Sequence, residues 1–206
     1  MRIVNDSQLL IWIAAIGMCS CNSNARFYDQ EKQLMRLADS IEIEANQLMD
    51  VSTEEAAHAF QWAQENLREF ELLLEDEEMS VTREEGEIIS DVSRARRLLK
   101  DQSKRRKSIA NSQKRTLMQL RGLGQALGNQ ATHDSQNTPI DSVYVAVNLT
   151  RELNMGRTLK ASMAETRSYA TRGIATVERI KPKSDSLQTA LRGRLARLIL
   201  QRDSTE

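Results

Sequence analysis

The residues of this chain whose chemistry is most distinctive are its only two thiols, Cys19 and Cys21. Thiolates act as nucleophiles, as metal ligands and as disulfide partners. A Cys-x-Cys disulfide would close a small, strained ring and constrain very little chain, so a structural bridge is disfavoured. No cysteine follows Cys21. The rest of the protein is therefore expected to contain neither a disulfide nor a cysteine nucleophile.

An apolar run precedes the two cysteines and covers residues 9–18, between polar residues at 5–8 and at 20–24. Crossing a bilayer takes about 20 apolar residues, and this run has only ten. Its length is typical of the core of a secretory signal peptide. Together with the cysteines, the segment resembles a bacterial lipoprotein signal peptide, in which an apolar residue and two small residues lead to a cysteine.

That resemblance implies that the leader is removed, that the cysteine thiol is diacylated and that the new amino terminus is usually acylated too. Two registers fit the pattern. Cleavage before Cys19 would place the bulky Met18 at the cut, whereas cleavage before Cys21 places the small Ser20 there. We prefer Cys21 as the lipidated residue, with residues 1–20 as the signal peptide, and Cys19 is the alternative. Two or more acyl chains anchor a protein stably, which implies a membrane-anchored lipoprotein on the periplasmic face or the surface of a bacterial cell.

Sites for metals and cofactors are poorly supported. Glu55 and His58 have the Glu-x-x-His spacing that di-metal helical bundles use in pairs, but the other histidine, His133, has no matching glutamate. The acidic run at 75–78 lacks the alternating ligands and the glycine of a calcium loop. The sequence has no Gly-rich phosphate loop and no Gly-x-Ser-x-Gly motif. It therefore predicts no metal, no cofactor and no catalytic residue.

Beyond the leader, the strongest local signal is a cluster of eight cations within residues 94–107. Such a cluster can bind nucleic acid, anionic lipid or an acidic protein surface. Nucleic acid is disfavoured as a ligand, because no aromatic residue lies among these cations to stack on bases. Export would also separate the protein from nucleic acid. The cluster is either a solvated helix face balanced by acidic helices of the same chain, or a contact surface for an envelope partner or for lipid. Its members are Arg94, Arg96, Arg97, Lys100, Lys104, Arg105, Arg106 and Lys107.

Composition predicts an all-α protein. Only 4% of the 206 residues are aromatic, 28% are charged, and there are two prolines and eight glycines. Residues with high helix propensity are abundant. The net charge of zero conceals a division, because residues 22–90 contain 18 acidic and 5 basic residues, whereas residues 91–206 contain 10 acidic and 23 basic residues. This division suggests acidic helices that either pack on basic ones or leave the basic ones for a partner.

Apolar residues at spacings of three and four predict a first helix over residues 27–49. Ser52 and Glu55 then form a capping-box pattern that begins a second helix, which we expect to end near residue 78. The short turn between them predicts an acidic helical hairpin over residues 22–79. Only about five residues separate Cys21 from the first helix, a tether of less than roughly 20 Å, so a lipidated cysteine would hold this helix close to the membrane.

Two longer helices are predicted after this hairpin. Heptads continue from residue 83 to residue 127, about 68 Å of helix, although polar residues enter the middle of the seam. A polar loop at 128–139 separates this helix from another over residues 141–180, and the two would form a long basic hairpin within residues 80–181. Pro182 is expected to end the second of these helices, leaving a C-terminal helix within residues 183–206. The expected fold is an elongated all-α bundle with antiparallel coiled-coil hairpins.

The leading functional hypothesis is a non-catalytic helical scaffold or binding protein, held in the bacterial cell envelope by its lipid anchor. Its expected partners are the membrane, through the anchor, and an envelope protein, with no nucleic acid and no cofactor; a homo-oligomer is compatible with the sequence. One alternative is a periplasmic helical-bundle enzyme or small-molecule binder, which would need a cavity lined by converging polar groups. The other alternative is an intracellular coiled-coil adaptor that keeps its N-terminus.

Overall fold

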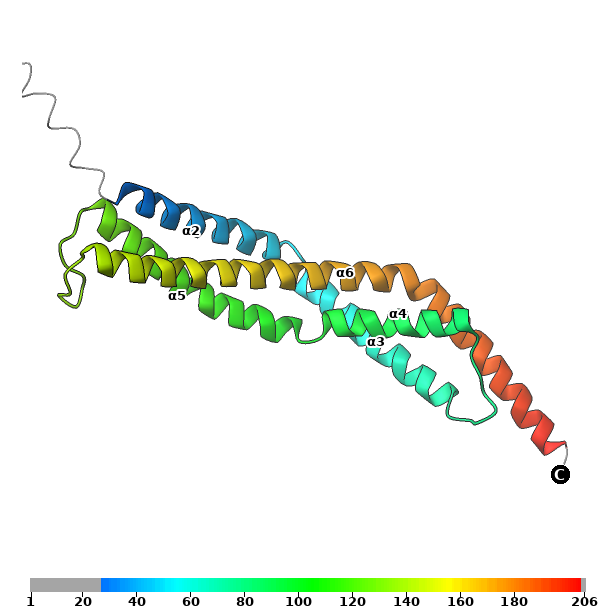
Figure 1. Cartoon of the computed structure of the whole chain (residues 1–206). Helices are drawn as coiled ribbons and strands as arrows, with labels where there is room; N and C mark the ends of the chain where they lie inside the picture. Colours follow the sequence, from blue (N-terminus) through cyan, green and yellow to red (C-terminus); the bar gives the residue numbers. More distant parts are fainter. Residues whose placement is uncertain (1–26, 205–206) are drawn as a thin grey trace, which may run out of the picture. The chain divides into compact units, whose positions relative to one another are not determined.

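A computed structural model describes residues 27–204, and their regular secondary structure is α-helical apart from one isolated bridge between His133 and Pro139. The all-α prediction with long antiparallel helices is confirmed. The leader, with Cys19 and Cys21, lies outside the described residues. The helices, labelled as in Figure 1, are α2 (Tyr28–Met49), α3 (Thr53–Leu73), α4 (Arg83–Leu99), α5 (Gln102–Gly128) and α6 (Ser142–Asp203).

The described chain divides into two compact units, each assembled from distant parts of the sequence. The first unit contains residues 27–40 and 115–157, and the second contains residues 41–114 and 158–204. Helices α2, α5 and α6 therefore contribute residues to both units, whereas α3 and α4 belong to the second alone.

The first unit is built around a close approach of three helices at Gly156 of α6. A Cβ atom at this position would lie 2.6 Å from Leu37 Cδ2 of α2 and 3.2 Å from Leu120 Cδ1 of α5. Only glycine leaves room for both leucines there. Leu34 and Leu120 are fully buried in the same unit. The loop between α5 and α6 closes it, and the Asp134 carboxylate of this loop accepts hydrogen bonds from the backbone of Gln136 (2.9 Å) and Thr138 (2.8 Å).

The core of the second unit joins α3, α4 and the C-terminal part of α6. Helices α3 and α4 pack against each other and run in opposite directions (Figure 1). Three alanines of α3 let the neighbouring helices approach closely, and Phe70 supplies the bulk of the packing. Thr82 caps α4, and with Glu85 it forms a reciprocal capping box. The buried residues are Ala56, Ala59, Ala63, Phe70, Leu73, Val92, Ala95, Leu99, Val177, Ile180, Leu187 and Leu191.

The expected antiparallel hairpin of the first two helices is wrong for the part that lies in the second unit. Glu44 of α2 pairs with Arg167, Asn66 of α3 accepts a hydrogen bond from Ser184, and Asp76, just after α3, pairs with Arg202. The residue numbers of the α6 partners increase along with those of the residues they contact in and just after α2 and α3. Both helices therefore run parallel to α6. The reason is that α3 buries its apolar face against α4 and α6, and not against α2.

The single long helix predicted over residues 83–127 is wrong as well, because it is interrupted between α4 and α5 at Lys100 and Asp101. Asp101 has a φ of 62°, the left-handed region that aspartate tolerates better than most residues. The apolar seam ends at Leu99, and the next positions carry Gln102 and Arg106, which cannot pack as apolar knobs. The Gln102 side chain donates to the Leu98 carbonyl (3.0 Å), and Asp101 supplies the first backbone acceptor of α5.

Helix α6 continues through Pro182, where the sequence predicts an end. Proline removes one backbone hydrogen bond and crowds the preceding turn, which usually stops or kinks a helix. Here Ile180 and Ser184 are buried on either side of it, and Ser184 donates its hydroxyl to Asn66 of α3 (2.8 Å). Packing against α3 therefore holds both turns in place, while the proline itself is exposed. Within residues 27–204, no helix is both long enough and apolar enough to cross a membrane.

Replacement of Gly173 by alanine tests the packing of α4 on α6. An added Cβ would lie 2.5 Å from Leu99 Cγ, and Leu99 is itself buried. Gly173→Ala should therefore lower the free energy of unfolding by about 1–3 kcal/mol, as overpacking does in other cores. The matched control is Gly193→Ala, which meets no atom within 4 Å and should raise it by roughly 0.5–1 kcal/mol. Urea unfolding followed by circular dichroism measures both. Equal effects of the two substitutions would contradict the close approach.

Candidate functional site

The cationic cluster of residues 94–107 lies at the junction of α4 and α5, entirely within the second unit. Seven of its eight residues are exposed, and Arg106 is half-buried. We call the seven exposed members the basic surface: Arg94, Arg96, Arg97, Lys100, Lys104, Arg105 and Lys107.

Two buried contacts fix the junction that carries the basic surface. Leu99 packs on Gly173 of α6 just before the interruption. Arg106 turns inward just after it and donates from Nη2 to the Val51 carbonyl (2.8 Å) between α2 and α3. Burial lowers the pKa of the Arg106 guanidinium from its usual value, but an arginine remains charged at neutral pH. Arg106 is therefore a positioning residue beneath the basic surface, and the sequence had placed it on the surface itself.

The side chains of the basic surface have few partners. Arg94 pairs with Asp91 (2.8 Å), and the Arg105 guanidinium lies 5.1 Å from the centre of the Tyr169 ring. This cation–π contact holds one guanidinium in place without neutralising its charge. The other five side chains have no ion pair or hydrogen bond in the described part of the chain: Arg96, Arg97, Lys100, Lys104 and Lys107.

The acidic helices find their countercharges elsewhere, on arginines of α6. Asp91 binds Arg179 (2.9 Å), and Asp76, just after α3, binds Arg202 (2.8 Å). Further pairs join Glu44 to Arg167, Glu69 to Arg192 and Glu85 to Arg194. Acidic and basic helices therefore do pack in one unit, but the basic surface takes almost no part in the exchange. This arrangement favours the contact-surface interpretation over internal charge balance.

One of these pairs shows how the α6 arginines act. Hydrogen bonding to Arg194 and to the Thr82 backbone lowers the pKa of the Glu85 carboxyl from its ordinary value of 4.5. A carboxyl whose pKa is lower in the folded state stabilises the fold above its unfolded pKa. That contribution is lost as the pH falls through the folded-state pKa. The ion pair between α4 and α6 therefore weakens only in acid.

The histidine positions do not gather into a site. Glu55 and His58 are both exposed on α3, and His133 is exposed in the loop after α5. Among residues 27–204, no group of three or more His, Cys, Asp or Glu side chains could hold a metal ion.

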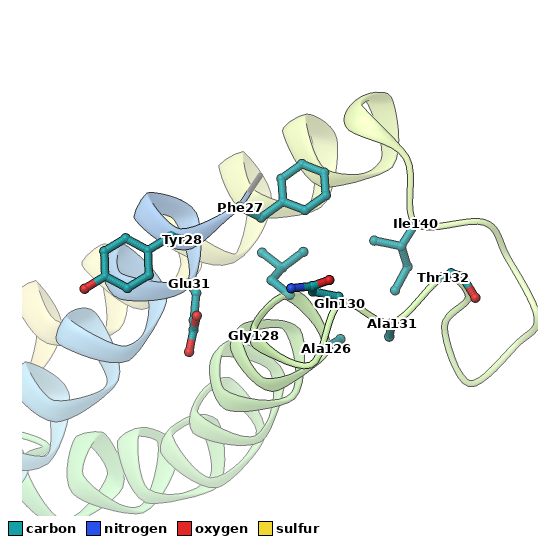
Figure 2. Close-up of a pocket in the computed structure, with 10 residues that line it drawn as sticks. Phe27, Tyr28, Glu31, Ala126, Gly128, Gln130, Ala131, Thr132 and Ile140 are labelled. Carbon is teal, nitrogen blue, oxygen red and sulfur yellow. The ribbon is translucent and has the colours of Figure 1, made fainter. Parts of the chain in front are cut away.

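The first unit contains two hollows that the sequence did not predict. One has a volume of about 380 Å³ and lies where the chain enters α2. Figure 2 shows Phe27 at the start of α2, Gln130 just after α5, and Ile140 at the end of the following loop around this hollow. Glu31 lies against the end of α5, where a Cβ on Gly128 would be 2.7 Å from its Oε1. The lining of this hollow combines apolar side chains with those of Glu31, Gln130 and Thr132.

The other hollow has a volume of about 440 Å³ and is surrounded by more polar side chains, from α5, the loop and α6. On α6 it includes Tyr144, Asn148, Arg151 and Glu152. These residues share one helix face at spacings of three and four, which is the one signal that could have indicated them from the sequence.

Comparison with known protein families, curated proteins and solved structures finds no match to this chain.

Neutralising the basic surface tests whether its charges serve the fold. Arg96, in the last turn of α4, and Lys100, its C-cap residue, are four residues apart, and like charges at that spacing repel each other by about 0.2–0.5 kcal/mol. The double variant Arg96→Gln/Lys100→Gln should therefore change the free energy of unfolding little, because the repulsion that it removes is similar in size to the stabilisation, about 0.3–1 kcal/mol, that cations give the C-terminal end of a helix. Arg179→Gln, which breaks the pair with Asp91, should lower it. Urea titrations at low and high salt measure both. A loss in the double variant as large as in Arg179→Gln would mean that internal charge balance explains the cluster.

Proposed function

We propose that this protein is a non-catalytic helical binding or scaffold protein, anchored by lipid in a bacterial cell envelope, whose basic surface holds an acidic face of another envelope protein. The observation that carries the proposal is the concentration of five cations without an ion pair to the described residues at one junction, in a unit where the carboxylates of neighbouring helices pair instead with arginines of α6. A surface that kept these charges only for solubility would not need them concentrated at one junction.

The anchor rests on the resemblance of residues 1–21 to a lipoprotein signal peptide. Cys21 is the proposed lipidation site, with Cys19 as the alternative. The described chain begins at Phe27 and is helical from Tyr28, so the tether from Cys21 to α2 is six or seven residues, less than roughly 25 Å when extended. A protein held so close to a bilayer samples envelope partners at high effective concentration.

The chemistry of the basic surface suits an acidic protein. Exposed Lys and Arg side chains steer association and set specificity, and their attraction falls as salt rises. Five of these side chains are long and form no ion pair or hydrogen bond within residues 27–204, so they can change rotamer to meet carboxylates on a second surface. Arg105 is the exception, because its stacking on Tyr169 presents it in one orientation and reduces the entropy lost on binding.

Position-specific photo-crosslinking in intact cells tests the contact. Ser103 and Ser108 are exposed and uncharged positions amid the cluster, and a photoreactive residue at either should capture an acidic envelope protein. The control position, Ser186 of α6, is exposed in the same unit and should capture much less. Adducts should disappear when Arg96, Lys100 and Lys104 are changed together to glutamine. Equal adducts at Ser186, or adducts that survive this triple change, would contradict the proposal.

A small-molecule binder is the second candidate function, and one observation favours it, the polar hollow of the first unit. An intracellular adaptor has no such support. Recovery of the protein in the cytosolic fraction with Met1 retained would favour the adaptor.

A further inference from the structure

The polar hollow of the first unit has an ordered hydrogen-bond network on its α6 side. The Tyr144 hydroxyl donates to Asp134 Oδ2 (3.1 Å), and Arg151 donates from Nε to Glu152 Oε1 (2.9 Å) and from Nη2 to Asn148 Oδ1 (2.8 Å). The backbone bonds to Asp134 and the Tyr144 hydroxyl lower the pKa of the Asp134 carboxyl, so this group is ionised at neutral pH. These contacts fix the lining before any ligand binds.

Two acceptors in this lining lack a donor. Glu152 is only 3% exposed, and its Oε2 atom is buried without a hydrogen-bond partner. On the facing helix α5, the Oε1 atom of Gln119 is also buried without a partner. Folded proteins satisfy nearly all such atoms, because each unpaired buried polar group costs about 1–3 kcal/mol. Two orphaned oxygens beside one cavity indicate that a hydrogen-bond donor belongs there.

The charges of the lining identify the kind of donor. The lining contains two carboxylates, Asp134 and Glu152, and one guanidinium, Arg151, so it carries a net negative charge. A primary ammonium group has three donors on one atom and no acceptor, which matches a carboxylate oxygen and an amide oxygen that both need a proton donor. Met118, Leu123 and Ile140 supply apolar lining for an alkyl chain.

We propose that this cavity binds a small alkylammonium ligand, whose ammonium group donates to Glu152 Oε2 and Gln119 Oε1. The site lies in the first unit and shares no residue with the basic surface. The proposal therefore goes beyond the envelope-binding function and stands or falls separately from it. Both residues line the cavity.

Calorimetric titration of the full chain with n-butylammonium tests the site, and n-butanol serves as the neutral probe of similar size. The protein should bind the ammonium at millimolar concentrations and the alcohol at least tenfold more weakly. Glu152→Gln should weaken ammonium binding at least tenfold. The control Asp39→Asn, which removes an exposed carboxylate from the same unit, should leave it unchanged.

Gln119→Leu provides a second variant in case Glu152→Gln does not fold, as circular dichroism will show. It removes the amide acceptor at similar volume and should weaken ammonium binding as well. The proposal is overturned if the protein binds the ammonium no better than the alcohol, which would leave the two oxygens to ordered water. It is also overturned if folded Glu152→Gln, or folded Gln119→Leu, binds the ammonium as the unaltered protein does.

Discussion

The arginines of α6 are the countercharges on which the second unit depends. They pair with carboxylates from α2, from α4 and from the chain around α3, so one helix supplies countercharges to three other segments. Exposed pairs of this kind contribute little individually. Apart from Asp91, which Arg179 shares with Arg94, the described carboxylates that pair with α6 form no ion pair with the cations at the α4–α5 junction. The basic surface therefore keeps its free charges because the nearby carboxylates pair with α6, and not only because its own sequence is rich in cations.

The interruption at Lys100 and Asp101 has a similar double effect. It ends an apolar seam that could not continue through Gln102 and Arg106, and it allows Arg106 to reach the Val51 carbonyl. The same turn places exposed cations from the end of α4 and the start of α5 at one junction. Stability and presentation therefore come from one local feature, whose fixed points are Leu99 on Gly173 and Arg105 on Tyr169.

Local signals predicted much of the fold. Periodicity predicted the start of α2 to within one residue, Ser52 was predicted correctly as a helix cap, and the polar loop before α6 was also predicted. Apart from the interruption at Lys100 and Asp101, which has local causes, the failures come from tertiary packing. The buried neighbours of Pro182 overrode its tendency to end a helix, and the direction of α3 depends on partners distant in sequence. At the candidate sites, the sequence predicted the cluster of cations but not which of them lack an ion pair or hydrogen bond in the described part of the chain. It missed the polar hollow, because Tyr144, Asn148 and Glu152 at helical spacing resemble a solvated face.

The central claim is that this helical body works from a lipid anchor in the envelope. Metabolic labelling of cells with a palmitate analogue tests it most directly. The unaltered protein should carry the label, the Cys21→Ala variant should lose it, and Cys19→Ala should retain it; the reverse pattern would move the anchor to Cys19. An unlabelled protein, or a label that survives in the Cys19→Ala/Cys21→Ala double variant, would contradict the account.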